Sequence, residues 1–169
     1  MNQVLAQWNA AETQSAMQVM MDCCGAHRWA REMVDQRPIP TESGLHEAAD
    51  RIWDKMMESD WMEAFSHHPR IGERKAQKAS SRSSAWSSQE QSSIKTAADS
   101  VLSALTHGNA RYEDKFGFTY IVCATGKTPE AMLAILRRRL TNARAAELRE
   151  AAEQQRQILH IRLRKSFGQ

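Results

Sequence analysis

Two adjacent histidines stand in the most polar short stretch of the chain, Ser-His-His-Pro-Arg-Ile-Gly-Glu-Arg at residues 66–74. An imidazole exchanges a proton near neutral pH, so either His67 or His68 could act as a general acid or base. A pair of surface or capping histidines at a helix end would give the same pattern. A zinc site is the poorer interpretation, because neither His-x-x-x-His nor Cys-x-x-Cys spacing occurs. The stretch alone does not rank the two histidines.

A second polar motif, Ser-Ser-Gln-Glu-Gln, occupies residues 87–91. Its S-x-x-E spacing predicts a capping box, with Ser87 as the N-cap of a long helix and Glu90 reaching back to the Ser87 N–H. The N-terminus of such a helix also offers unpaired N–H groups and a positive dipole end, which suit an anionic ligand. Capping and ligand binding both remain open interpretations of this motif.

Basic side chains gather in the C-terminal third, at residues 137–139 and at Arg162, Arg164 and Lys165. A solvated helix face is the ordinary explanation. Arg139 and Arg162 have apolar neighbours, however, and an inward arginine needs an acid or a substrate carboxylate as its partner. Periodicity does not choose between these arginines.

These residues must be positioned by helices, because glycine and proline are few while Ala, Met, Gln, Glu and Arg are plentiful. Residues 72–88, rich in Ser, Lys and Arg, are expected to form a long mobile loop with room for a short helix. Ser43 is expected to cap one helix, and Pro129 to open another. Apolar periodicity predicts helices at residues 11–24, 26–34, 43–56, 60–65, 87–105, 109–116, 129–140 and 143–166.

The only β-like run is Gly-Phe-Thr-Tyr-Ile-Val-Cys at residues 117–123. One isolated strand cannot make a sheet. We therefore expect an all-α, single-domain bundle of roughly eight helices spanning residues 1–169, with one buried extended segment at about 118–124. Its backbone N–H and C=O groups need partners, and a ligand could supply some of them.

The 169 residues fit one domain, and the formal net charge of +3 gives no general argument for nucleic acid. Cys23, Cys24 and Cys123 are too few and too poorly spaced for a disulfide framework, so we expect reduced thiols. No apolar run approaches 18 residues, so no membrane span is expected. The polar start, MNQVLAQWNAAE, does not resemble a secretory signal. Together these features favour a cytoplasmic location.

Several stretches, in order along nearly the whole chain, resemble the 2-oxo-4-hydroxy-4-carboxy-5-ureidoimidazoline (OHCU) decarboxylases. They are CCGAHRWAREMVDQRP, HPRIG, SSQEQ, NARYEDKFGFTYIVCATG, RRRLTNARAAELREA and ILHIRLRK. Each motif is weak alone, and the order of six makes the resemblance specific. Arg70 departs from the family pattern, in which Asp often follows His-Pro, and so does Thr119, where Pro often follows Gly-Phe.

The resemblance implies an all-α enzyme, commonly a homodimer, that uses no cofactor and no metal to convert the small molecule OHCU to (S)-allantoin in urate degradation. By position, the catalytic histidine is the one before proline, His68, and Glu90 is its catalytic partner. The implied substrate-binding residues are Pro69, Ser87, Gln91, Tyr120, Ile121, Val122, Cys123, Ala124 and Arg162.

Two other classes remain as alternatives. A helical binding or regulatory module could contact nucleic acid through the basic C-terminal helix, which would require its arginines to share one exposed face. A metal-dependent hydrolase is the third possibility. The expectation retained is an enzyme with no nucleic-acid partner and no membrane partner.

Overall fold

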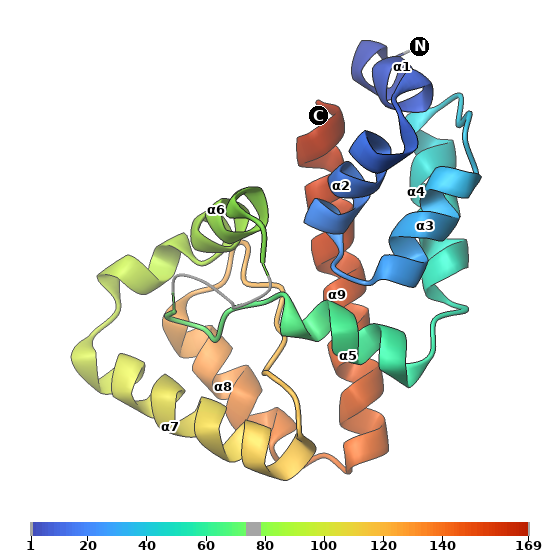
Figure 1. The fold of residues 1–169 in the computed structure, drawn as a ribbon. Coiled ribbons are helices and arrows are strands. Elements are labelled where there is room, and N and C mark those ends of the chain that lie inside the picture. The colour runs from blue at the N-terminus through green and yellow to red at the C-terminus, as the bar shows by residue number, and fades with distance from the viewer. Residues whose placement is uncertain (1, 74–78, 169) are drawn as a thin grey trace. The chain divides into compact units, whose positions relative to one another are not determined.

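The computed structural model describes residues 2–73 and 79–168, and in that part of the chain all regular secondary structure is helical (Figure 1). The all-α class is therefore confirmed, and nine α-helices within the described ranges are close to the eight expected. In chain order the elements are α1 (Gln3–Ala10), α2 (Thr13–Cys23), α3 (His27–Asp35), α4 (Glu42–Trp53), α5 (Glu58–Ser66), α6 (Ser81–Glu90), the 3-10 helix η1 (Ser92–Thr96), α7 (Asp99–Phe116), α8 (Pro129–Arg139) and α9 (Arg144–Phe167).

The largest differences from the sequence-based expectation lie between residues 72 and 116. A long mobile loop with room for a short helix is expected at residues 72–88; the helix α6 begins there at Ser81 and continues to Glu90, and residues 74–78 lie outside the described chain. The helix expected at 87–105 is divided among the end of α6, η1 and the start of α7. Serine is a weak helix former but a strong N-cap, and Ser80 caps α6 by accepting the Ser83 N–H at 3.0 Å.

Two other helix starts test the capping signals. Pro129 occupies the first turn of α8, as expected, and Thr128 caps that helix by accepting the Ala131 N–H at 3.1 Å. Ser43 does not cap α4. Thr41 does so by accepting the Gly44 N–H at 3.1 Å. The N-terminal helix α1, which the sequence did not predict, starts at an Asn2 cap.

Contacts divide the chain into two compact units, of which the first comprises Met1–Ala64 with Arg156–Gln169. Within it, α2 packs on α3 and α3 packs on α4. Trp29 is fully buried and its indole N–H donates to the Ala49 C=O at 3.2 Å, which fixes α3 against α4. The C-terminal half of α9 joins this unit through a hydrogen bond from Arg162 to the Asp22 C=O.

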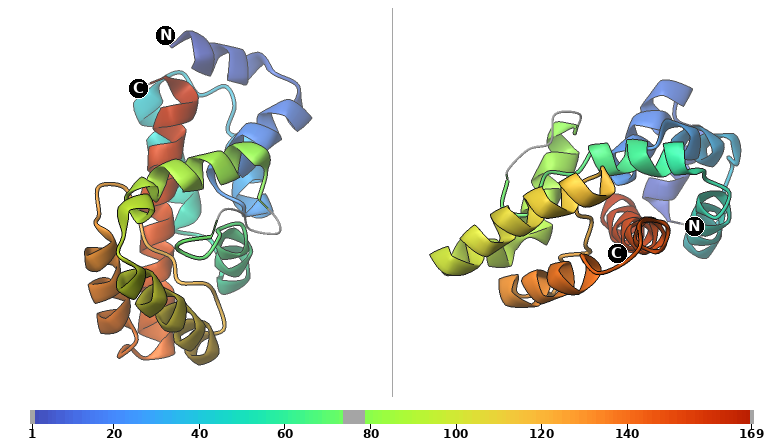
Figure 2. Two further views of the ribbon diagram at one scale, coloured as in Figure 1. Left: turned by 90° about the vertical axis from the view of Figure 1, so that its left-hand side faces the viewer. Right: turned by 90° about the horizontal axis from the view of Figure 1, so that it is seen from below.

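The second unit, Phe65–Gln155, is built around α7 and α8, which lie alongside each other in Figures 1 and 2. Gly108 permits their close approach, because a Cβ at this position would lie 2.5 Å from the Leu136 Cδ2. An aromatic cluster fills the centre of the unit, with ring centroids 4.7–5.6 Å apart for the contacts of Tyr112 with Phe116, Phe118 and Tyr120. These aromatic contacts tie α7 to the segment that follows it.

That segment, residues 118–124, has no regular secondary structure and is buried except at Thr119, as expected. It leaves α7 at Gly117, whose φ of 80° is a left-handed conformation that glycine adopts without strain. The buried extended segment is therefore confirmed. The single domain predicted for residues 1–169 remains a prediction.

Candidate active site

His68 follows the end of α5, where the Phe65 C=O accepts its backbone N–H at 3.0 Å. The next residue, Pro69, is buried, and the imidazole of His68 is half-buried. Its Nε2 lies 2.7 Å from the Oε1 of Gln155, a residue of α9 that is fully buried. His67 is also half-buried, so exposure does not rank the two histidines. The bond to Gln155 gives the His68 ring a defined position.

Ser87 and Glu90 lie at the C-terminal end of α6, so the capping-box prediction is wrong. Ser80 is the N-cap of this helix, and the Ser87 C=O accepts the Gln91 N–H at 3.1 Å as the helix ends. The positive end of the α6 dipole is therefore at Ser80 and not at Ser87. Any role of Ser87 and Glu90 in binding must come from their side chains.

Gln91 connects the two polar motifs. Its Oε1 accepts the backbone N–H of Gly72 at 3.0 Å. Gly72 closes the turn after Pro69 with a φ of 95°, a conformation that favours glycine. This bond holds the loop that carries His68 against the end of the helix that carries Glu90, within the second unit. The structure therefore brings the His-Pro motif and the Ser-x-x-Glu-Gln motif together.

Arg70 holds the same loop to α7. Its guanidinium donates to both carboxylate oxygens of Glu113 at 2.7 Å and reaches Glu73 at 3.4 Å. Hydrogen bonding and charge from Glu113 raise the pKa of Arg70. Arg70, one of the two residues that depart from the family pattern, thus has a structural partner on α7.

Some backbone groups of the extended segment form hydrogen bonds with other residues of the protein. The Cys123 N–H donates to Gln154 Oε1 at 2.9 Å, and the Cys123 C=O accepts from Lys127 Nζ at 2.6 Å. Arg139 donates to the Ile121 C=O at 2.6 Å. Among the described residues, the backbone N–H and C=O of Val122 have no hydrogen-bond partner. The expected unpaired groups are therefore fewer than the sequence suggested, and those of Val122 are among them.

Two consecutive residues of α9 bring distant parts of the second unit together. Gln154 holds the extended segment at Cys123, and Gln155 holds the ring of His68. Neither glutamine was predicted from the sequence to take part in the site. The available signal was Gln155 itself, a polar residue on a helix face that also presents the buried Ala151, Ala152, Ile158 and Leu159.

The arginines separate into different roles. Arg139 is fully buried and pairs with the equally buried Glu147, with Nη2 to Oε1 at 2.5 Å. Burial lowers the pKa of Arg139, but the hydrogen bond and charge of Glu147 outweigh it and raise the pKa. Arg139 is thus committed to an internal partner. Arg138 pairs with Glu150 at the surface, and Arg137 is exposed, so these three arginines do not form one basic face.

Arg162, the predicted substrate anchor, belongs to the first unit. It is 2% exposed, and Nη1 donates to the Asp22 C=O at 3.3 Å. Burial raises the pKa of the nearby Cys24 thiol to about 12. The three cysteines are buried without a disulfide, as expected. The role of Arg162 as substrate anchor remains a prediction.

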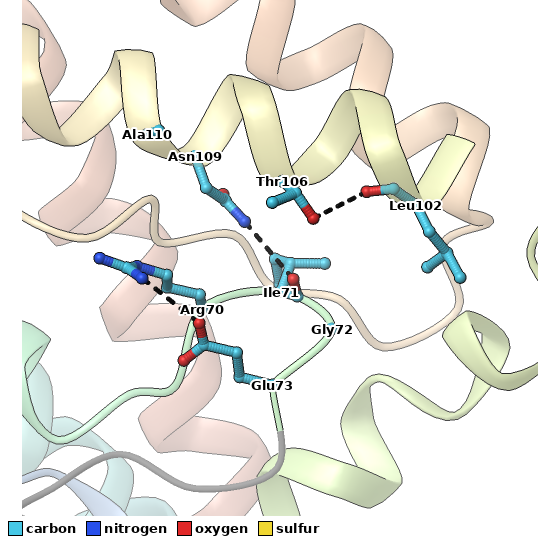
Figure 3. Close-up of a pocket in the computed structure, with 8 residues that line it drawn as sticks. All are labelled: Arg70, Ile71, Gly72, Glu73, Leu102, Thr106, Asn109 and Ala110. Atoms are coloured by element: carbon cyan, nitrogen blue, oxygen red, sulfur yellow. Dashed lines mark hydrogen bonds and ion pairs between the residues drawn. The ribbon is translucent and has the colours of Figure 1, made fainter. Parts of the chain in front are cut away.

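Two surface recesses adjoin the loop after Pro69. The first, of about 300 Å³, lies between that loop and α7 (Figure 3). In it, the buried Asn109 donates to the Ile71 C=O at 3.4 Å, while its Oδ1 has no partner among the described residues. The second, of about 470 Å³, includes the predicted residue Gln91. His68 and Glu90 line neither recess. The lining residues of the first are Arg70, Ile71, Gly72, Glu73, Leu102, Thr106, Asn109 and Ala110, and those of the second are Gly72, Glu73, Ser88, Gln91, Ile94 and Lys95.

Among residues 2–73 and 79–168, no group of three or more His, Cys, Asp or Glu side chains is arranged to hold a metal ion. No helix in those same ranges has the length and apolar character needed to cross a membrane.

Comparison with known proteins gives a consistent family. The model of the OHCU decarboxylase family matches residues 9–164. The uric acid degradation bifunctional protein TTL of Arabidopsis thaliana is 36% identical over 147 residues, covering 86% of this chain and 45% of its own length. The 2-oxo-4-hydroxy-4-carboxy-5-ureidoimidazoline decarboxylase of Haloferax volcanii is 23% identical, covering 83% of this chain and 82% of its own. The chain thus spans less than half of the plant protein.

Solved structures agree. A crystal structure of OHCU decarboxylase in the presence of (S)-allantoin superposes with a TM-score of 0.76 and 34% identity, over 88% of this chain and 96% of that one. A crystal structure of (S)-allantoin synthase superposes with a TM-score of 0.72 at 19% identity, over 96% of this chain and 53% of that one. The second likeness concerns the fold alone.

Proposed function

The chain belongs to the OHCU decarboxylase family, and we propose that it catalyses the decarboxylation of OHCU to (S)-allantoin in urate degradation. The observation that carries this proposal is the family match across residues 9–164, which includes both polar motifs and the extended segment. The contacts of the second unit support it, because they gather these three sequence-distant parts. The plant relative is a longer, bifunctional protein, and the proposal covers the decarboxylase reaction only.

In the proposed reaction, the bond between the ring carbon and its carboxylate breaks and CO₂ leaves. The electron pair stays on that carbon and spreads into the adjacent ring system as an enolate-like species. A proton then adds to one face of the carbon and gives the S configuration. The protein must hold the carboxylate perpendicular to the π system and supply donors for the developing charge, so positioning and preorganised donors account for most of the acceleration.

His68 is the proposed acid. Its imidazolium N–H bond breaks, the electrons remain on nitrogen, and the proton forms the new C–H bond. An imidazole suits this role because it changes protonation state near neutral pH. The defined ring position of His68 supports the choice, since a catalytic acid must approach one face only. Pro69, buried directly after it, fixes the backbone from which the ring projects.

Glu90, Ser87 and Gln91 form the proposed polar wall opposite the acid. Glu90 holds the hydroxyl or ureido N–H groups of the substrate, and its negative charge near the carboxylate favours loss of CO₂. The Ser87 hydroxyl and the Gln91 amide bind substrate oxygens. The Gln91–Gly72 hydrogen bond supports this grouping, because it keeps the end of α6 at the loop of His68.

The extended segment is the proposed recognition edge for the ureido or hydantoin portion. The contacts assigned to it are the backbone groups of residues 120–124, among which those of Val122 lack a described protein partner. This segment is held at both sides of Val122, by Arg139 at Ile121 and by Gln154 at Cys123. Arg162 is the proposed anchor for an anionic or carbonyl group of the substrate.

We further propose that the reaction needs no cofactor or metal, since the substrate itself delocalises the electron pair. A homodimer and a cytoplasmic location are also proposed, on the family resemblance and on the reduced thiols. Light scattering of the purified protein tests the first of these, by distinguishing a mass near 38 kDa from the 19.2 kDa of one chain.

The experiment is to add the protein to freshly generated OHCU and to follow CO₂ release together with the circular dichroism of allantoin. The spontaneous reaction gives racemic allantoin, so optical activity isolates the catalysed route. The proposal predicts fast formation of (S)-allantoin that EDTA does not change. Racemic product at the uncatalysed rate would contradict it, and loss of activity with EDTA would refute the metal-free mechanism.

A further inference from the structure

We infer that Gln155 is a positioning residue for the reaction: its Oε1 accepts the Nε2–H of His68, fixes the ring tautomer and leaves Nδ1 as the nitrogen that transfers the proton. The inference rests on the proposed role of His68. The contact itself is direct, with 2.7 Å between Nε2 and Oε1. It joins residues 87 positions apart in the sequence, the loop after α5 and the middle of α9.

Burial argues against a role for Gln155 in packing alone. The side chain is fully buried on the apolar face of α9. Its amide Nε2 has no hydrogen-bond partner among the described residues, and a buried unpaired donor destabilises a fold by about 1–3 kcal/mol. A methionine or leucine would fill similar space without that penalty. The glutamine is therefore explained by what its other end does, which is to hold His68.

The amide oxygen suits both states of a catalytic acid. An amide Oε1 is an acceptor only, so it requires a proton on the Nε2 of His68. The bond is retained when the ring is an imidazolium and when it is a neutral Nε2–H imidazole. The proton that comes and goes is then on Nδ1: the Nδ1–H bond breaks, its electrons stay on nitrogen, and the substrate carbon gains the hydrogen.

Gln154, the residue before Gln155, links the His68 contact to the extended segment. Gln154 holds Cys123 of the extended segment from the same turn of α9. The acid and the proposed recognition edge are thus set by adjacent residues of one helix, and groups built on a rigid helix keep their spacing better than groups on separate loops. A displacement of about 1 Å in such a site is enough to reduce the rate by about 10²-fold.

The first test replaces Gln155 by methionine. We expect kcat for (S)-allantoin formation to fall by up to about 10²-fold with little change in KM, while the denaturant midpoint stays the same or rises. Gln14→Met, at an exposed position of α2, is the matched control and keeps both values. A purely structural Gln155 would give the opposite result, with a lower midpoint and an unchanged kcat.

Gln155→Glu is the second test, and its readout is the pH profile. A carboxylate beside the Nε2–H stabilises the imidazolium and raises the pKa of His68. Activity that needs protonated His68 falls as pH rises through that pKa, so its basic limb should move to higher pH. Gln14→Glu controls for the added charge. An unmoved limb in an active Gln155→Glu variant would overturn the inference.

The third test does not depend on activity. Long-range ¹H–¹⁵N spectra of the ¹⁵N-histidine-labelled protein, assigned with His67→Asn and His68→Asn, report which nitrogen of neutral His68 carries the proton. The inference requires an Nε2–H ring in the wild type and a mixture of tautomers in Gln155→Met. An Nδ1–H wild-type ring would refute it. If the wild-type protein failed to decarboxylate OHCU, the proposed function would fail, while these spectra would still decide the Gln155 contact.

Discussion

Two polar contacts made by α9 differ in how completely they are satisfied. Glu147 pairs with Arg139, both side chains are fully buried, and Tyr112 and Asn142 also donate to this carboxylate. Gln155, about two turns further along α9, bonds a half-buried histidine through Oε1, while its buried amide Nε2 has no partner among the described residues. The fully paired Glu147 contact has the features of a structural network. The Gln155 contact, with its buried amide N–H groups left unpaired among the described residues, has features that favour a functional role.

The Arg139 network has a clear task in the fold. Arg139 donates to the Ile121 C=O, and its Cζ lies 4.9 Å from the ring centroid of Tyr120. It therefore holds two neighbouring residues of the extended segment. A buried ion pair is stable only while both partners remain, because removal of one leaves an uncompensated charge. The comparison therefore predicts that stability depends on this network and that catalysis depends on the contact to His68.

The largest effect on stability is expected for Arg139→Met. Loss of the buried partner of Glu147 should lower the free energy of unfolding by about 3–5 kcal/mol, measured by chemical denaturation. Arg138→Met is the matched control, because this neighbouring residue forms a surface pair with Glu150 and should change stability by less than about 1 kcal/mol. Equal losses in the two variants would erase the distinction between the buried and exposed pairs.

A smaller, pH-dependent effect is expected in the first unit. His46 Nδ1 lies 2.5 Å from His160 Nδ1, and His160 Nε2 lies 2.6 Å from Asp50. Burial, followed by the charges of His160 and Arg164, lowers the pKa of His46 below its ordinary 6.5, although Asp50 and Glu42 oppose this. The unfolded chain therefore binds more protons at His46 as pH falls below about 6.5, and the folded state loses stability there.

The measurement is the unfolding free energy of wild type and His46→Gln between pH 7.5 and 5. The wild type should lose more stability on acidification, by about 1 kcal/mol or less. Asp50 also has a lowered pKa. Burial raises it, but the hydrogen bonds and charges of His160 and Arg156 outweigh burial. Its contribution is lost only as pH falls below the ordinary 3.8, outside this window. Identical pH slopes would contradict the account of His46.

The smallest effect is expected for Arg70→Ala, although Arg70 makes a two-bond pair with Glu113. The arginine side chain is 50% exposed, and exposed pairs contribute little because water screens them. Stability should change by no more than about 1 kcal/mol in thermal or chemical unfolding. A loss as large as that of Arg139→Met would show that the loop of His68 depends on this surface contact.

Much of the fold could be predicted from local sequence. The apolar run at residues 118–124 had no second strand to pair with, so a buried extended segment in a helical protein followed directly. Pro129 marked a helix start correctly because the first turn needs no N–H from that residue. These predictions depended only on neighbouring residues.

Two features of the candidate site could not be predicted from local sequence. The Ser87–Glu90 spacing matched a capping box, but residues 80–90 contain six serines, and only the tertiary structure selects Ser80 as the cap. The His68–Gln155 contact spans 87 positions, and no local pattern encodes such a pairing. A glutamine on an otherwise apolar helix face was a signal that something polar faces it, without saying what.

The central claim is that His68 delivers the proton that makes allantoin chiral. Its most direct measurement is the circular dichroism of allantoin formed from fresh OHCU by His68→Asn, with His67→Asn as the matched control. We expect His68→Asn to lose about 10²–10⁴-fold in rate and to leave racemic product from the spontaneous reaction, while His67→Asn keeps most of its activity. Formation of (S)-allantoin by His68→Asn at the wild-type rate would contradict the claim.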